Sequence, residues 1–175
     1  YASWYNKLLK KSKKKNLKKI IINWNFSSVN KSASWKRKSK EGGGIINFYG
    51  IHIFALISLL KFNNLIFSNI YKRNKNEEIW HAEFSNKNNV KFIIKLKINS
   101  KKTYFKIAYQ FNKNFSQKIL FNNKYFFISK NKNEDYRVET LNKYIAYNIK
   151  FGQSKSLHLK IIKFLDKVIN NTEII

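Results

Sequence analysis

The stretch VKFIIKLKI, Val90 to Ile98, has an apolar residue at every even position and lysine at three odd ones. A two-residue period is that of a β-strand with one buried and one solvent-facing side, because successive side chains point to opposite faces. Only Ile93 departs from the alternation. The stretch therefore predicts a half-buried strand.

Similar alternation continues on both sides of this strand. Further strands are expected in IWHAEFS (79–85), TYFKIAYQF (103–111), FSQKILF (115–121) and KYFFIS (124–129). The separators NKNN, NSKK, NKN and NN are rich in asparagine, which favours hairpin turns. We therefore predict an antiparallel meander of four or five strands.

Two segments outside the meander are expected to be helical. Ile45 to Phe67 is the most hydrophobic part of the chain and predicts a buried helix, with a membrane-spanning segment as the alternative. Ser154 to Asn170 has apolar residues on one helical stripe and lysines on another, which predicts an amphipathic C-terminal helix. The predicted fold class is α+β, with residues 1–44 as a basic RNA-binding arm and loop and residues 45–175 as a single α+β domain.

The charge of the chain is its most unusual property. Thirty-six Lys and Arg against nine Asp and Glu give a net charge of +27 and a pI near 10.2. Codons rich in A and T account for part of the lysine content, but not for the imbalance of sign, since asparagine has similar codons. Such a charge works against a compact state unless a polyanion neutralises it. We therefore expect a polyanionic partner, with nucleic acid the first candidate.

The basic residues are concentrated in residues 1–40, which contain thirteen Lys and Arg and no acid. Lysines next to phosphates give binding that depends on salt and little on sequence. Trp35 is the best candidate for stacking on an unpaired base, whereas Trp4, Tyr5, Trp24 and Phe26 could either stack or anchor a small core. The predicted RNA-binding residues are Lys7, Lys10, Lys11, Lys13, Lys14, Lys15, Lys18, Lys19, Trp35, Lys36, Arg37, Lys38, Lys40, Lys160, Lys163 and Lys167.

Few residues suit catalysis. Gly42 to Gly44 are not followed by the Lys and Ser or Thr of a phosphate loop, so a hinge or a close backbone approach is expected there. His81 and Glu83 would share a face of a strand, and a metal-free ribonuclease using this pair is an alternative function. His52 and His158 are interpreted as core or rim histidines. Cysteine is absent, and no metal, cofactor, small-molecule substrate or enzymatic activity is expected.

In its composition and layout, the chain resembles organellar ribosomal proteins as a class. The features that carry the resemblance are the acid-free basic arm, the small mixed domain, the Lys- and Asn-rich turns and the AT-rich codon usage. The resemblance implies a structural role in a mitochondrial-type ribosome, where the arm would thread between rRNA helices. Its partners would be rRNA and neighbouring ribosomal proteins. A membrane-associated organellar subunit, with residues 45–67 in the bilayer, is a further alternative.

Overall fold

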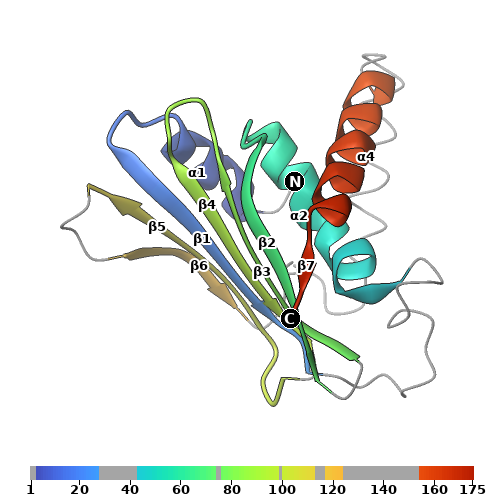
Figure 1. Ribbon diagram of the computed structural model, residues 1–175. Coiled ribbons are helices and arrows are strands. Elements are labelled where there is room, and N and C mark those ends of the chain that lie inside the picture. Colours follow the sequence, from blue (N-terminus) through green and yellow to red (C-terminus); the bar gives the residue numbers. More distant parts are fainter. Residues whose placement is uncertain (1–2, 28–42, 74–75, 99, 113–116, 124–153) are drawn as a thin grey trace.

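The structure, a computed structural model, describes residues 3–27, 43–73, 76–98, 100–112, 117–123 and 154–175. A seven-stranded sheet dominates it (Figure 1), with strand order β6-β5-β1-β4-β3-β2-β7. The strands are β1 (Leu17–Asn25), β2 (Asn64–Arg73), β3 (Asn76–Ser85), β4 (Lys91–Lys97), β5 (Tyr104–Phe111), β6 (Lys118–Asn123) and β7 (Glu173–Ile174). The helices are α1 (Ser3–Ser12), the π-helical turn η3 (Ile45–Gly50), α2 (Ile51–Leu59) and α4 (Ser154–Asn170).

Strand β1 lies inside the sheet, so the predicted N-terminal arm is wrong for residues 17–25. It pairs in parallel with β4 and antiparallel with β5. Its sequence LKKIIINWN buries Ile20, Ile22 and Trp24 on one face, as a strand with period two does. The lysines at its start conceal this alternation in the sequence.

The predicted antiparallel meander is also wrong. Segments 79–85, 103–111 and 115–121 do contain strands, and so does Val90 to Ile98, but β4 and β5 are separated in the sheet by β1. The sheet is mixed, because β1 is parallel to β4 and β7 is parallel to β2. The expected strand at 124–129 lies outside the described residues.

All the described α-helices pack on the same face of the sheet (Figure 1). On α1, Trp4 lies 5.6 Å from the Phe105 ring of β5, measured between centroids. Phe54 of α2 lies 5.3 Å from Trp80 of β3, and Phe164 of α4 contacts Phe54 at 6.0 Å. The strand residues on this face are the buried ones, so the core lies between the sheet and the helices. The opposite face, which we call the open face, is not covered by any helix of the described residues.

The apolar segment Ile45 to Phe67 is not one helix. It is helical up to Leu59, and it then turns at Lys61, whose φ of 62° is left-handed, before β2 starts at Asn64. None of the helices in the described ranges is long and apolar enough to cross a membrane. Helix α4 spans the residues predicted to be helical at the C-terminus.

Candidate active site

The structure distributes the predicted RNA-binding lysines over several elements. Lys7, Lys10 and Lys11 are on α1, Lys13 to Lys15 are in the following turn, Lys18 and Lys19 start β1, and Lys160, Lys163 and Lys167 are on α4. Lys19 pairs with Lys91 on the open face, whereas α1 and α4 lie on the other face. Trp35, Lys36, Arg37, Lys38 and Lys40 lie outside the described residues. The described lysines therefore do not converge on one site.

Two of the tryptophans weighed as base-stacking candidates belong to the core. Trp4 is 4% exposed and Trp24 is 6% exposed. Trp24 lies edge-on to Phe105, with the ring centroids 5.4 Å apart. The alternative interpretation, that they anchor the core, is therefore the correct one for both side chains.

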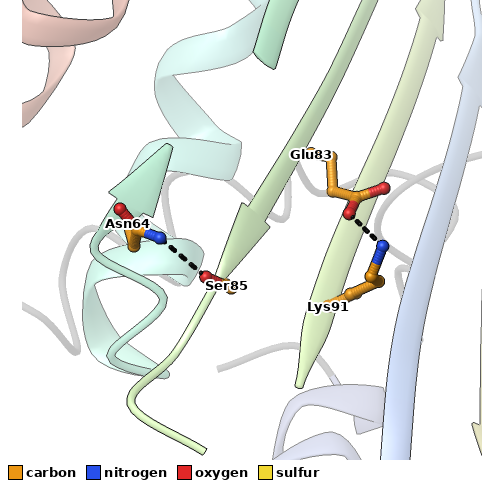
Figure 2. Close-up of polar contacts among 4 residues, drawn as sticks. All are labelled: Asn64, Glu83, Ser85 and Lys91. Atoms are coloured by element: carbon orange, nitrogen blue, oxygen red, sulfur yellow. Dashed lines mark hydrogen bonds and ion pairs between the residues drawn. The ribbon is translucent and has the colours of Figure 1, made fainter. Parts of the chain in front are cut away.

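His81 and Glu83 do share the face of β3 that is turned away from the helices, and each side chain has a further neighbour there. The Glu83 carboxylate is 2.7 Å from the Lys91 ammonium of β4 (Figure 2), while the His81 ring is directed at Phe67, 5.0 Å away between centroids. Desolvation, with a contribution from Lys95, lowers the pKa of His81, and Glu83 opposes this only in part. In the same view, Asn64 donates a hydrogen bond to Ser85 and so ties the ends of β2 and β3 together.

A different histidine stands among aromatic side chains where β1 ends and α2 begins. His52 is in the first turn of α2, with its ring 6.4 Å from that of Trp24. Trp24 lies 4.5 Å from Phe26, and Phe26 lies 4.6 Å from Tyr49 of η3, all between ring centroids. We call Trp24, Phe26, Tyr49 and His52 the aromatic site. It places one imidazole beside three aromatic rings.

The electrostatics of His52 favour its neutral form. The residue is exposed at the surface, yet surrounding protein atoms still desolvate the ring and lower its pKa below the ordinary value of 6.5. At neutral pH the imidazole is therefore mostly uncharged, with one ring nitrogen able to accept a proton and the other able to donate one.

A polar hollow of about 550 Å³ lies at the same end of β1. It is lined by Ser27, Lys101, Lys102, Thr103, Tyr104, Asn122 and Asn123. The backbone N–H of Ser27 donates a hydrogen bond of 2.8 Å to the hydroxyl of Thr103, which fixes the end of β1 against the start of β5. Phe26 belongs to the aromatic site and the next residue, Ser27, to the hollow, so the two adjoin along the chain. Lysines, hydroxyls and amides together suit an anionic ligand rich in hydrogen-bonding groups.

The described residues offer no evident place for a dinucleotide. Such a cofactor needs a strand, a glycine turn and a helix whose first N–H groups face the pyrophosphate. Gly43 and Gly44 precede η3, but both are buried, and Ile45 and Ile46 behind them are 0% and 5% exposed. A pyrophosphate therefore does not fit at this helix start. The described residues also contain no cluster of acids and histidines that could hold a metal ion.

Comparison with known proteins shows similarity in structure only. No protein-family model and no curated protein matches the sequence. Among solved structures, GenD2 from gentamicin A biosynthesis in complex with NAD has a TM-score of 0.67 at 9% identity over 98% of this chain and 58% of that chain. The dehydrogenase MviM from Clostridium difficile has a TM-score of 0.64 at 10% identity, with 97% and 59% of the two chains covered.

A third structure is more similar in sequence over a shorter length. The WlbA dehydrogenase from Thermus thermophilus, in complex with NAD and UDP-GlcNAcA, has a TM-score of 0.54 at 18% identity over 83% of this chain and 45% of that chain. The likeness establishes the fold. The chain spans about three fifths of the length of the first structures that it matches.

These neighbours overturn the resemblance to ribosomal proteins. They include two dehydrogenases and a 3-ketoreductase, and the structures of GenD2, WlbA and the 3-ketoreductase contain NAD or NADP, whereas a ribosomal protein is not among these neighbours. The expected role in rRNA binding, the expected rRNA and ribosomal-protein partners, and the expectation that the chain is no enzyme are therefore wrong. Composition suggested the wrong class of protein, because the same excess of lysine can occur on the surface of an unrelated fold.

The sequence contained one usable signal for the aromatic site. His52 follows three consecutive glycines and Tyr49 within eleven residues, so a turn, an aromatic ring and an imidazole come close together along the chain. The interpretation of His52 as a core or rim residue did not identify the aromatic site. Trp24 and Phe26 come near His52 only because α2 packs on the sheet next to the end of β1. Their distance along the chain from His52 left no local pattern to detect.

Proposed function

We propose that this chain is the substrate-handling part of an NAD(P)-dependent oxidoreductase that interconverts a hydroxyl group and a ketone on a cyclic, anionic substrate. The observation that carries the proposal is the aromatic site, with the His52 imidazole beside Trp24, Phe26 and Tyr49 at the end of β1. The fold supports it, since a 3-ketoreductase in complex with NADP and a sugar-nucleotide dehydrogenase in complex with NAD have similar structures.

His52 supplies the proton chemistry in this proposal. Oxidation of an alcohol to a ketone removes the hydroxyl proton, and reduction returns a proton to the carbonyl oxygen. Because burial lowers the pKa of His52, its ring is neutral at physiological pH and can accept the hydroxyl proton as a general base. The reverse reaction uses the protonated ring as the acid.

The surroundings of His52 fit a sugar ring with a charged substituent. The faces of Phe26 and Tyr49 offer apolar area to the C–H groups of a ring, and the adjoining hollow offers Lys101, Lys102 and Ser27 to an anion. The nicotinamide cofactor accepts or donates the hydride when it is bound. Since the glycines before η3 do not accommodate its pyrophosphate, protein outside the described residues would hold it.

The test is turnover of sugar nucleotides by the full-length protein. UDP-GlcNAcA and TDP-linked sugars are incubated with NAD or NADP, and nicotinamide reduction is followed by absorbance. We expect turnover with at least one pair, and we expect His52→Asn to lower kcat by about 10²-fold or more, the usual contribution of a general base. The control is His81→Asn on the opposite face of the sheet, which is expected to keep the activity.

Two results would contradict the proposal. One is the absence of nicotinamide reduction with every substrate and cofactor pair by a correctly folded protein. The other is a His52→Asn variant as active as the His81→Asn control, which would remove His52 from the reaction.

A further inference from the structure

The face of the sheet opposite the helices has an ordered pattern of side chains. Strand registers place Phe67, Glu83, Ile93, Ile21, Ala108 and Ile119 in one row that crosses β2, β3, β4, β1, β5 and β6. Residues directly opposite each other on neighbouring strands lie on the same face. The row is therefore apolar except for Glu83. Ala108 is buried and the Glu83 side chain is 12% exposed, but Ile21, Ile93 and Phe67 are half-buried and Ile119 is 58% exposed, so the larger apolar side chains of the row are accessible.

Lysines flank this apolar row on both sides. Lys19 and Lys91 stand opposite each other two residues before Ile21 and Ile93. Lys95 of β4 and Lys106 of β5 stand two residues away on the other side, both opposite Asn23 of β1. Lys97 lies one row further out. These five lysines and the apolar row form the centre of the open face.

The open face carries far more positive than negative charge. Among the described residues, its carboxylates are Glu83, which is paired with Lys91, and Glu173 on the edge strand β7. Like charges opposite each other in a sheet are destabilising; Glu83 offsets the charge of Lys91, and an anion lying against Lys19 would offset the rest. An apolar centre bordered by charge is the anatomy of a protein interface.

We propose that the open face binds an acidic protein surface with an apolar centre, of which a helix with a leucine stripe flanked by glutamates is the simplest form. The lysine rows lie about 6.7 Å from the apolar row on each side, so they stand about 13 Å apart along the strands, and a helix about 10–12 Å wide fits between them. From β2 to β6 the row crosses about 24 Å, the length of roughly sixteen helical residues. An area on the order of 500 Å² is at the small end for protein interfaces, so the complex is a weak, salt-sensitive one.

The charge pattern disfavours a second copy of the chain as the occupant. A twofold pairing of two open faces would bring five lysines against five lysines, with only Glu83 and Glu173 on each side to oppose them. Single-stranded nucleic acid is disfavoured for another reason. Its unpaired bases stack on flat rings, whereas the centre of the row has the branched side chains of Ile21 and Ile93, and its aromatic ring, Phe67, lies at the β2 end.

The test uses the full-length chain, labelled for NMR, and defined probes. The first probe is a synthetic helical peptide with a leucine stripe flanked by glutamates, and the second is the same peptide with serine in place of leucine. The third is a single-stranded RNA oligonucleotide. We expect the first peptide to shift the amide signals of Ile21, Ile93 and Lys106, and the serine peptide to bind about tenfold more weakly.

Charge reversal separates the open face from the general charge of the chain. Lys95→Glu with Lys106→Glu should weaken binding of the leucine peptide by about tenfold or more. The matched control, Lys160→Glu with Lys163→Glu on α4, changes the net charge equally and should weaken it by no more than about twofold.

Three outcomes would overturn the inference. The first is equal weakening in both double variants, which would mean binding by overall charge alone. The second is tighter binding of the RNA oligonucleotide than of the leucine peptide at the same amides. The third is a concentration-dependent dimer of the free chain in analytical ultracentrifugation that Lys95→Glu with Lys106→Glu abolishes.

Discussion

Replacing Ser68 by alanine tests the polar chain that joins the sheet to the end of α4. The indole N–H of Trp80 donates a hydrogen bond of 2.9 Å to the Ser68 hydroxyl, which lies 2.7 Å from the hydroxyl of Thr172. Thr172 donates to the carbonyl of Val168 at 2.6 Å. Since the single proton of Thr172 is used there, Ser68 must donate to Thr172, and every bond in the chain points toward α4.

The magnitude follows from burial. Trp80 is 0% exposed and Ser68 is 1% exposed, so water cannot replace the lost acceptor. Ser68→Ala leaves the indole N–H without that acceptor, and an unsatisfied buried donor costs about 1–3 kcal/mol. We expect a loss of about 2 kcal/mol in the free energy of unfolding, measured by urea denaturation followed by circular dichroism.

A double-mutant cycle with Trp80→Phe shows whether the cost comes from this bond. Phenylalanine removes the donor, so Ser68→Ala should cost about 1 kcal/mol less in that background than in the wild type. A loss below about 0.5 kcal/mol for Ser68→Ala alone, or equal losses in the two backgrounds, would refute the reasoning.

Three further perturbations have defined outcomes. In Gly50→Val the added carbons meet Trp80, which is only 3.1 Å from the position of a Cβ, and overpacking should lower the free energy of unfolding by about 1–3 kcal/mol in urea denaturation; wild-type stability would contradict this. Because the folded-state pKa of His52 is lowered, its contribution to stability is complete above about pH 6.5 and is lost as the pH falls below that value. His52→Gln should therefore flatten the stability–pH curve on that side, and an unchanged curve would exclude the effect. Glu83→Gln breaks an ion pair in which the Lys91 side chain is 56% exposed and the Glu83 side chain 12% exposed. Because water still reaches Lys91, the cost should be about 1 kcal/mol, and a loss above about 3 kcal/mol in urea denaturation, typical of a buried pair, would contradict this.

The local elements were more predictable than their arrangement. Val90 to Ile98 and Thr103 to Phe111 alternate clearly, and β4 and β5 form there. Ser154 to Asn170 has a helical stripe, and α4 covers those residues. The pairing of β1 between β4 and β5 has no local signal, since it depends on contacts between residues far apart in the chain.

The errors have physical causes in particular residues. The lysines from Lys10 to Lys19 suggested an arm, although Ile20, Ile22 and Trp24 directly after them carry the alternation of a buried strand. In Ile45 to Phe67, hydrophobicity alone does not separate a helix from a strand, and the change occurs at the left-handed Lys61. Both errors concealed the aromatic site, because Trp24 and Phe26 lie at the end of β1, whereas Tyr49 is in η3 and His52 is in α2.

The most direct test of the aromatic site is an NMR titration of the histidine ring signals with and without UDP-GlcNAcA. We predict that the ligand shifts the ring signals of His52 and changes its pKa, while those of His81 on the opposite face stay unchanged. Shifts at His81 in place of His52, or no shift at either ring under conditions in which the ligand binds, would contradict the account.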